Sequence, residues 1–524
     1  MKPYIFLSRA LLSAIVAGSV AACTTDFEEI NTNPNTMLVG DLNPYGVFEA
    51  MFYGYGNTNT RFCYSYSNEL VQFTASSSAT SNFHRYSFNN SNLESIWSAY
   101  GQYAANANHM ISQGYKYGDL GAVAVGKTLK ALFLSNATDI FGDIPCREAF
   151  RVSEGVTTPV LDSQEDVYRQ IFDMLEDANE LYADGHSFAK PTIDIMYNGN
   201  MSLWRKFNNS LYMRLLMRVS ARPEMKATEK LGEIVSKPSK YPVIGSNSES
   251  ATIKNTGIAP YYGTYRTSEM TKTSFCSHLL TNMFIDMCLI TGAQTEIDPR
   301  LYTMCAPTSA DSEWIGVQGG ASLSEMREDR DDASSLNYKV LVRDAAPVWI
   351  LDYSEVQFIL AEAALKGYIP GGEAAARQHY ETAVTASCEK WAPLAVYSNA
   401  SYPITEARIN AFLEGKLAGW DTHEDKASLI ADQKFISLFW IGFEAYHELR
   451  RTGRPIIPIG NGCSYNNFEY PQRLPYPTNT VGSNSANVQI ALDRMGGDNT
   501  MRTPVWWSYK AINGTFTAVR VQKP

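Results

Sequence analysis

Positive charge is scarce in this chain of 524 residues. Charged residues make up 19% of the sequence, and 44 lysines and arginines stand against 54 aspartates and glutamates, a formal net charge of −10. Proteins that bind nucleic acid need clustered basic residues to neutralise phosphates. The composition therefore argues against a nucleic-acid partner, and none is expected.

Long hydrophobic runs are also missing, with one exception at the N-terminus. Outside that segment no stretch approaches the 18 continuous apolar residues of a membrane-spanning helix. The exception is the run Ala10–Val20, which follows the basic residues Lys2 and Arg9 and leads to Ala21-Ala22-Cys23. It is too short to remain as a membrane span and is typical of a leader that is cut off.

Cys23 is the most informative residue of this leader. Small residues directly before a cysteine are what a lipoprotein signal peptidase needs, because the thiol then carries diacylglycerol; a plain secretory signal is the alternative. We expect residues 1–22 to be removed, Cys23 to be lipidated, and residues 23–43 to form a tether. One lipid-bearing terminus attaches the protein to a membrane without inserting the fold.

Catalytic and cofactor signatures are absent as well. There is no G-x-S-x-G, and the His-Glu pairs at His423 and His447 lack the second histidine of zinc peptidases. Residues 121–128 match the spacing of a phosphate loop, but no strand precedes them and their alanines and valines suit a helix. No C-x-x-C occurs, and with Cys23 lipidated the other seven cysteines cannot all pair, so buried free thiols are expected. We predict no catalytic residue, cofactor or metal site, although missing motifs argue only weakly against an enzyme.

Helical periodicity dominates what is present. Apolar residues recur at steps of three and four, and several segments begin at a capping residue or end at glycine. Two of the segments, Tyr353–Lys366 and Glu373–Trp391, form a pair joined by a Pro-Gly-Gly turn, as in a tetratricopeptide hairpin. The expected helices are Asn92–Gln113, Val123–Asn136, Ser163–Tyr182, Trp204–Val219, Tyr353–Lys366, Glu373–Trp391 and a last long helix, Ala427–Arg450.

Four long segments rich in Gly, Ser, Asn, Pro and Tyr separate these helices: Thr58–Asn92, Pro238–Thr273, Thr291–Ala346 and Gly453–Trp507. Loops of this length are often functional.

Aromatic residues are plentiful, with 31 tyrosines and 9 tryptophans, and several lie in these loops. Sugar faces present C–H bonds that pack on aromatic rings, while polar side chains bind the hydroxyl groups. The alternative is that each ring folds back as a plug beneath its own loop. The candidate ligand-binding residues are Phe83, Tyr86, Tyr261, Tyr262, Tyr265 and Trp314.

Several motifs, taken together and in order, resemble the SusD/RagB family of outer-membrane nutrient-binding lipoproteins, in its SusD-like branch. Most of them read as scaffold, and Glu355 and Glu362 in one of them are candidates for bonding loop amides. The motifs are Asp26-Phe-Glu-Glu-Ile-Asn-Thr-Asn-Pro-Asn35, Thr138-Asp-Ile-Phe-Gly-Asp-Ile-Pro145, residues 204–220, Tyr353–Ala364, Gly442-Phe-Glu-Ala-Tyr-His-Glu-Leu-Arg-Arg-Thr-Gly453 and Pro471-Gln-Arg-Leu-Pro-Tyr-Pro477.

The resemblance implies an all-α fold in which four tetratricopeptide-like helix pairs pack against an irregular, loop-rich helical part. Residues 44–524 would then form a single composite domain. The resemblance also implies a lipid-anchored protein at the outer membrane, facing the cell exterior, that captures oligosaccharides. Its partner would be a SusC-like TonB-dependent transporter barrel, which it covers as a lid.

Three other functions remain open at this stage. The protein could capture peptides, as members of the RagB type do; it could be a surface glycoside hydrolase; or it could be a scaffold without a small ligand. The family's ligand contacts lie on variable loops, so no motif transfers a binding residue to this chain.

Overall fold

The computed structural model describes residues 43–76, 83–328 and 333–521. Cys23, the leader 1–22 and the tether 23–43, except for Asn43 itself, lie outside these residues. Within them the chain is mainly helical, as predicted. The helices of eight or more residues are α3 (Phe48–Phe62), α5 (Asn90–Tyr117), α6 (Leu120–Phe141), α7 (Gln164–Ala183), α8 (Met201–Arg218), α9 (Ala227–Ser236), α15 (Tyr353–Leu365), α16 (Gly372–Trp391), α17 (Glu406–Glu414), α18 (Lys426–Ser437), α19 (Glu444–Thr452) and α21 (Ser485–Met495).

Short elements fill the segments between these helices. The short helices are α4 (Asn68–Leu70), α10 (Lys272–Phe275), α11 (Asn282–Cys288), α12 (Leu301–Met304), α13 (Leu323–Glu328), α14 (Tyr338–Leu341), α20 (Thr478–Ser483) and α22 (Tyr509–Asn513). The strands are β1 (Thr74–Ser76), β2 (Ala251–Ile253), β3 (His278–Leu280), β4 (Leu289–Ile290), β5 (Glu296–Ile297), β6 (Cys305–Ala306), β7 (Ser335–Leu336), β8 (Val348–Leu351), β9 (Ile457–Ile459) and β10 (Ala518–Arg520).

Consecutive helices pack as pairs, which agrees with the expected tetratricopeptide-like arrangement. Helix α5 packs on α6, α6 on α7, α7 on α8, α15 on α16, and α18 on both α15 and α19. The turn between α5 and α6 is short because Gly118 ends one helix in the left-handed conformation and the Asp119 side chain caps the next through the Ala122 amide. The phosphate-loop match falls inside α6, as predicted, and Lys127 pairs there with Asp177 at 2.6 Å.

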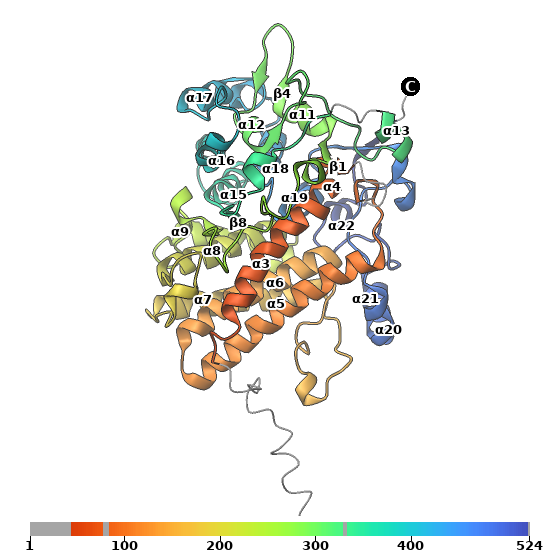
Figure 1. Cartoon of the computed structure of the whole chain (residues 1–524). Coiled ribbons are helices and arrows are strands. Elements are labelled where there is room, and N and C mark those ends of the chain that lie inside the picture. The colour runs from red at the N-terminus through yellow and green to blue at the C-terminus, as the bar shows by residue number, and fades with distance from the viewer. Residues whose placement is uncertain (1–42, 77–82, 329–332, 522–524) are drawn as a thin grey trace, which may run out of the picture.

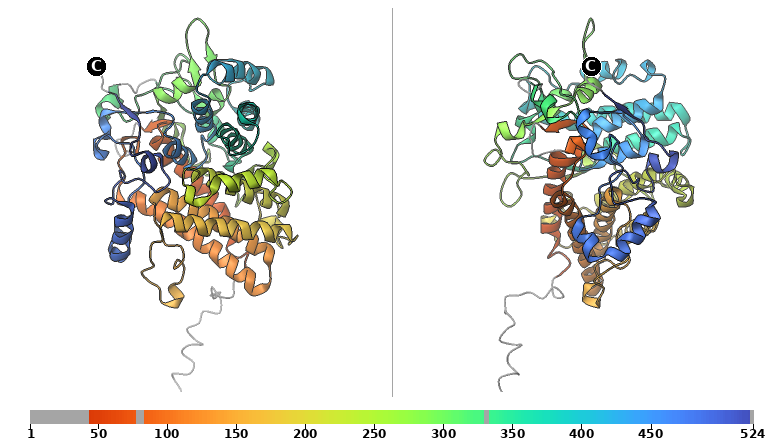
Figure 2. Two further views of the ribbon diagram at one scale, coloured as in Figure 1. Left: turned by 180° about the vertical axis from the view of Figure 1, so that it is seen from behind. Right: turned by 90° about the vertical axis from the view of Figure 1, so that its right-hand side faces the viewer.

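Two regions can be distinguished in the molecule (Figure 1). Helices α5, α6 and α7 lie in the lower part, and α11, α12, α16 and α17 lie in the upper part, with α3 running from one toward the other. The views from behind and from the side show the same division (Figure 2). In the upper part β1, β3, β7 and β6 form a four-stranded sheet in that order, and neighbouring strands run antiparallel.

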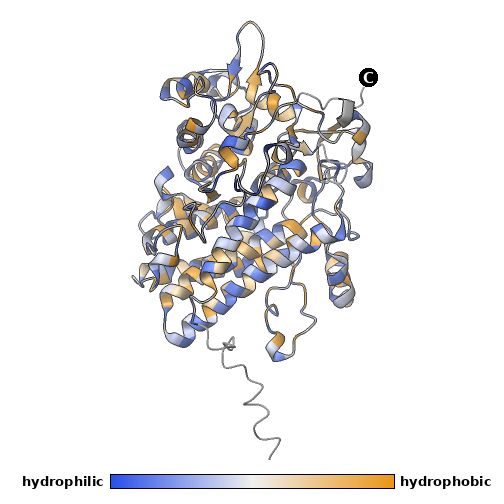
Figure 3. Ribbon diagram, viewed as in Figure 1, coloured by the Kyte–Doolittle hydropathy of each residue, from blue (hydrophilic) through white to orange (hydrophobic). Residues whose placement is uncertain are grey.

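The core is continuous across both parts. Hydrophobic and hydrophilic residues are interspersed along α3 and α5, as expected of helices with one buried face (Figure 3). Trp204, Trp391 and Trp507 are fully buried and anchor the interior. Seven cysteines in the described part of the chain are unpaired and six of them are buried, as expected of free thiols in a core.

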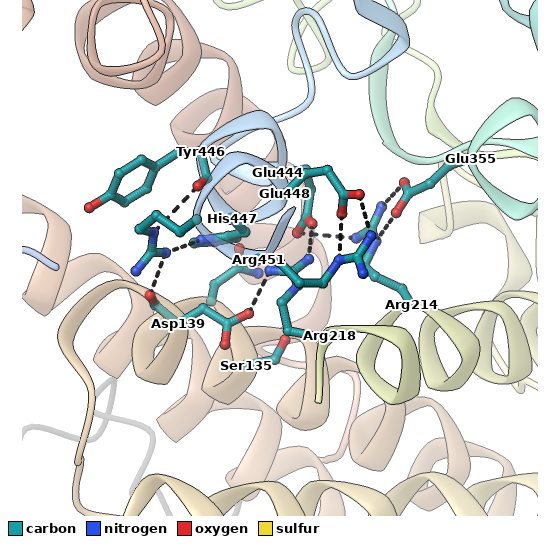
Figure 4. A network of polar contacts seen from close by, with 12 residues as sticks. Ser135, Asp139, Arg214, Arg218, Glu355, Glu444, Tyr446, His447, Glu448 and Arg451 are labelled. Atoms are coloured by element: carbon teal, nitrogen blue, oxygen red, sulfur yellow. Dashed lines mark hydrogen bonds and ion pairs between the residues drawn. The ribbon is translucent and has the colours of Figure 1, made fainter. Parts of the chain in front are cut away.

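Charged side chains from four helices meet in the interior (Figure 4). Arg214 on α8 holds Glu355 of α15 through two hydrogen bonds of 2.7 and 2.5 Å and lies 3.4 Å from Glu444 of α19. Arg218, one turn further along α8, binds Glu444 at 2.5 Å and Asp139 of α6 at 2.9 Å. Five buried charges therefore tie α6, α8, α15 and α19 together.

A second cluster continues from α19. Arg451 binds Glu362 of α15 through two bonds, the Nη1 bond measuring 2.8 Å, and also binds Glu448, which lies 3.0 Å from Lys434 of α18. Glu355 and Glu362 therefore bind guanidinium groups, and the hypothesis that they bond loop amides is wrong. Four of the six motifs that carried the family resemblance supply all of these charges except Lys434, so the motifs encode most of the junction of the helix pairs.

The expectation of one last long helix over Ala427–Arg450 is also wrong. The chain forms two helices, α18 and α19, separated by residues 438–443, in which Trp440 and Gly442 have φ of 71° and 52°. The Gly442 carbonyl accepts a hydrogen bond of 2.5 Å from Ser67, within the π-helix η2 (Cys63–Ser67). The apolar period runs through the break, because the residues of the turn are themselves buried.

Candidate ligand-binding site

Tyr302 lies at the centre of an aromatic stack in the upper part of the molecule. Its ring stacks on Tyr402 with a centroid distance of 3.9 Å and an interplanar angle of 15°, and Trp314 meets it edge-on at 5.0 Å. The three rings come from α12, from the segment after α16 and from the loop between β6 and β7. Tyr302 is 8% exposed, whereas Trp314 and Tyr402 are only partly buried. The outer two rings therefore offer apolar surface that the central ring supports.

Polar contacts hold the backbone under this stack. The Tyr302 carbonyl accepts hydrogen bonds from Asn337 Nδ2 at 2.9 Å and from the Ser398 hydroxyl, and Asn337 also bonds Ser398 at 2.8 Å. The segments around Asn337 and Ser398 are thus both bound to the Tyr302 carbonyl, although all three residues lie far apart in sequence. The ring positions follow from this backbone framework rather than from the loops alone.

A buried ion pair anchors the same short helix to the tetratricopeptide-like pairs. Arg300, directly before α12, binds Asp298 at 2.6 Å, and neither side chain is exposed. The same guanidinium group donates to Ser387 of α16 at 2.9 Å and to Gln433 of α18 at 2.8 Å. Arg300 therefore links the aromatic stack to the helical scaffold.

Two cavities share Tyr302 in their walls. The larger measures about 520 Å³, and the smaller, about 260 Å³, also contains Tyr402 and Arg408. Arg408 lies over the Tyr402 ring at 4.9 Å. Volumes of a few hundred Å³ with a few placed polar groups are typical of ligand sites. Polar members of the larger wall are Lys272, Ser309, Ser335, Asn337, Lys339, Ser398 and Asn399.

The tyrosines at 261 and 262 lie elsewhere, against α3. Tyr261 donates a hydrogen bond to the Glu49 carboxylate and meets Tyr53 edge-on at 5.7 Å. Burial, together with Glu49, raises the pKa of Tyr261 to about 12. Tyr262 lies under the Arg266 guanidinium at 4.5 Å. Both rings are partly exposed, so they form a second aromatic surface that is separate from the two cavities.

Tyr265 and Tyr86 point into the protein. Tyr265 packs between Tyr64 and Phe275 at centroid distances of 5.0 and 5.7 Å. Tyr86 is completely buried, and its hydroxyl accepts a hydrogen bond of 2.8 Å from Gln72. A ring without exposed surface cannot stack on a sugar in this conformation, so Tyr86 is a core residue. This corrects its place among the candidates, and Tyr265 lies as a plug beneath its loop.

Phe83 belongs to a third small cluster. It meets Tyr66 edge-on at 4.8 Å and Phe88 at 4.7 Å, and it remains partly exposed. Neither cavity beside Tyr302 includes it. The six predicted residues are thus divided among separate places, and Trp314 alone of them belongs to the stack around Tyr302.

Sequence reasoning missed Tyr302, Tyr402 and Arg408. Tyr402 lies in the segment Ser398-Asn-Ala-Ser-Tyr-Pro403, whose composition is that of the loops from which Trp314 was chosen. The same signal could have selected it. Tyr302 follows Asp298-Pro-Arg-Leu, and nothing in that pattern marks it as the centre of a stack.

The described residues contain no group of three or more His, Cys, Asp or Glu side chains arranged to hold a metal ion. Across the same residues, no helix combines the length and apolar character needed to cross a bilayer.

Comparison with known proteins adds independent information. Residues 36–477 match the sequence profile of a SusD-like family described as starch-binding and associating with the outer membrane. Among curated proteins none matches the chain.

Solved structures with the same fold are numerous. A chitin-binding protein superposes with a TM-score of 0.74 at 25% identity, covering 89% of this chain and all of the other. A SusD homologue from Bacteroides fragilis gives 0.71 at 21%, with 89% and 99% covered. A chitin-binding SusD homologue from Flavobacterium johnsoniae gives 0.70 at 22%, with 88% and 98% covered. The last two show the fold alone, because their identities are low.

Proposed function

The chain belongs to the SusD-like family of outer-membrane nutrient-binding proteins, and on this basis we propose that it is a cell-surface lipoprotein that captures oligosaccharides at the Tyr302 stack. In this proposal Trp314 and Tyr402 provide the flat surfaces on which sugar faces pack. Asn, Ser and Lys side chains of the larger cavity bond the hydroxyl groups. The observation that carries the proposal is an aromatic stack whose central ring, Tyr302, lines two cavities.

Two cavities with one shared wall favour a ligand with several sugar units. A chain that crosses the stack fills both cavities, whereas a monosaccharide fills only one. The similarity to a chitin-binding protein at 25% identity agrees with a polymeric carbohydrate as the source of the ligand. Capture followed by delivery to a TonB-dependent, SusC-like transporter barrel completes the proposed function, and no catalysis is part of it.

Glycan binding tests the proposal directly. We expect the purified protein to bind one class of polysaccharide in a panel that also contains mixed peptides. Trp314→Ala and Tyr402→Ala should each weaken that binding at least tenfold, because each removes an apolar stacking surface whose burial is worth about 1.5–3 kcal/mol. Calorimetric titration gives the affinities, and circular dichroism confirms that the variants fold.

A matched control is Tyr117→Ala. Tyr117 is 52% exposed at the end of α5, and we expect its loss to leave binding unchanged. Binding to peptides alone would replace the glycan proposal with the peptide-capturing one. Unchanged binding in both stack variants would remove the site. Release of reducing ends from a bound glycan during long incubation would show an enzyme instead.

Delivery has its own test. We expect the lipoprotein to co-purify with a TonB-dependent barrel from detergent-solubilised outer membranes, and a preparation without such a barrel would contradict the delivery step.

A further inference from the structure

The larger cavity beside Tyr302 is basic although the protein is acidic. Among the described residues, two lysines, Lys272 and Lys339, line it, and no aspartate or glutamate does. The chain as a whole has a formal charge of −10. The described wall of the cavity is therefore positively charged in a chain that is acidic overall.

Both lysines are available to a ligand. Each is exposed, and within the described part of the chain neither forms an ion pair or a side-chain hydrogen bond. Other lysines show the usual alternative: Lys206 and Lys230, for example, each pair with a glutamate. An ammonium group left without a carboxylate at a cavity wall retains its full attraction for an incoming anion.

The two lysines are also held at defined positions. Lys272 is the first residue of α10 and Lys339 the second of α14. The Tyr338 hydroxyl donates a hydrogen bond of 2.8 Å to the Met270 carbonyl, which ties the two segments together. The backbone positions that carry the two lysines are therefore fixed relative to each other.

The smaller cavity has no such excess of positive charge. Its wall contains Arg408 but also Glu296, whose carboxylate accepts hydrogen bonds from the backbone amides of Lys416 and Leu417 at 2.7 and 2.8 Å. Asp298 in the same wall is neutralised by Arg300. Of the two cavities, only the larger one thus has a net positive charge among its described wall residues.

We infer, on the premise of the proposed glycan capture, that this protein selects an anionic oligosaccharide that carries carboxylate or sulfate groups. The anionic groups lie in the larger cavity against Lys272 and Lys339. Uncharged sugar faces pack on Trp314 and Tyr402. A neutral glycan gains the stacking contacts but leaves both ammonium groups unpaired.

Matched pairs of glycans test the inference, since the two members of each pair share one sugar backbone and differ in whether it bears anionic groups. The probes are oligogalacturonates against their methyl esters, for carboxylates, and dextran sulfate against dextran, for sulfates. We expect one anionic member to bind at least tenfold more tightly than its neutral counterpart at low salt. The advantage should shrink as ionic strength rises, because exposed charges are screened.

Replacement of the lysines provides the second arm. The double variant Lys272→Gln/Lys339→Gln should lose most of the preference for the anionic probe and keep its affinity for the neutral one. Lys190→Gln serves as control, because Lys190 is exposed and, among the described residues, unpaired, and it lines neither cavity. We expect it to behave as the unaltered protein.

The outcomes separate this inference from the proposed function. If neutral and anionic probes bind equally, or if the double variant keeps the preference, charge selection is wrong and glycan capture stands. If only neutral glycans of a wider panel bind, charge selection is likewise wrong. If no glycan binds, both proposals fail.

Discussion

His447 shows what burial among arginines does to a single titratable residue. Burial, together with Arg218 and Arg450, lowers its pKa well below the ordinary value. Its Nδ1 lies 2.6 Å from Nη2 of Arg450, which can only donate, so Nδ1 accepts and the ring is neutral. His447 is completely buried and is a packing residue.

This histidine makes stability depend on pH. The pKa of His447 in the folded protein lies below the unfolded value of about 6.5. Its contribution to the free energy of unfolding is therefore fully present above pH 6.5 and is lost as the pH falls below that value. Near pH 5 the loss should reach about 2 kcal/mol for this one residue. Melting temperatures measured from pH 7 to pH 5 should fall, and His447→Gln should flatten that fall.

A carboxylate provides the contrast within the same measurement. Burial opposes the ionisation of Glu448, but Arg451 and Lys434 outweigh it and lower its pKa to about 2. Its contribution is present above pH 4.5 and is lost only as the pH falls toward 2. Glu448 therefore adds nothing to the fall between pH 7 and pH 5, which His447 shares with the buried His84 and His278, whose pKa values burial lowers to about 3. An equal slope in His447→Gln would contradict the part assigned to His447.

Arg214 should be among the most costly residues to replace. Arg214→Met leaves the carboxylates of Glu355 and Glu444 buried without their cation, and breaking a buried pair costs about 3–5 kcal/mol. Urea denaturation should show the loss. Arg151→Met is the control, because Arg151 pairs with Glu154 at the surface, and its midpoint should not change. Similar midpoints for both variants would mean that the network does not stabilise the fold.

Sequence identified which residues are charged but not with whom they pair. Glu355 lies 141 residues from Arg214, and only the packed helices bring them together. The same limit applies to the ligand site. Trp314 was selected from its loop, whereas its partner Tyr302 is recognisable only after the chain has folded.

At the level of elements, the turn between α18 and α19 depends on a glycine. Gly442 has φ of 52°, and a Cβ there would lie 2.2 Å from the Asn59 side-chain oxygen. Gly442→Ala therefore combines backbone strain with a clash, and we expect a loss of at least about 2 kcal/mol.

Gly367→Ala is the matched comparison. Gly367 also has a positive φ, 73°, but a Cβ there would meet nothing within 4 Å. We expect it to cost about 1 kcal/mol, from strain alone. Urea denaturation of both variants separates the clash from the strain. Equal losses of unfolding free energy in the two variants would show that the Asn59 side chain moves away from the new methyl group.

Helix ends were predictable where the chain carries local signals. Capping residues and glycine ends placed α5, α7, α15 and α16 within a few residues of the expected bounds. The break after α18 was missed because its apolar residues continue the helical period. Helix α3 begins before the expected loop Thr58–Asn92 and extends into it, and α21 lies inside the expected loop Gly453–Trp507. These helices are fixed by packing against distant segments rather than by strong local signals.

At the scale of the whole molecule, six short motifs were enough to indicate the fold. Their charged residues specify how the helix pairs meet, and this junction distinguishes the architecture from other all-helical ones. The irregular part, with its short strands and aromatic stack, has no such signature. Its geometry depends on contacts such as the one between Asn337 and the Tyr302 carbonyl.

Attachment to the membrane is predicted to depend on Cys23 alone. Cys23→Ala removes the thiol that would carry lipid, and none of the described helices is long and apolar enough to cross a bilayer. We expect the variant to appear in soluble fractions, whereas the unaltered chain sediments with outer membranes. Persistence of the variant in the membrane fraction would contradict lipid anchoring.

The Arg300 anchor has a consequence for the proposed capture and transfer of a ligand. Because Arg300 fixes α12 to both α16 and α18, the aromatic stack cannot swing independently of the helices behind it. Binding then costs little conformational entropy, but the stack cannot let go by rearranging. Transfer must come from outside, through tilting of the entire molecule or through competition by the receiving surface for the same sugars.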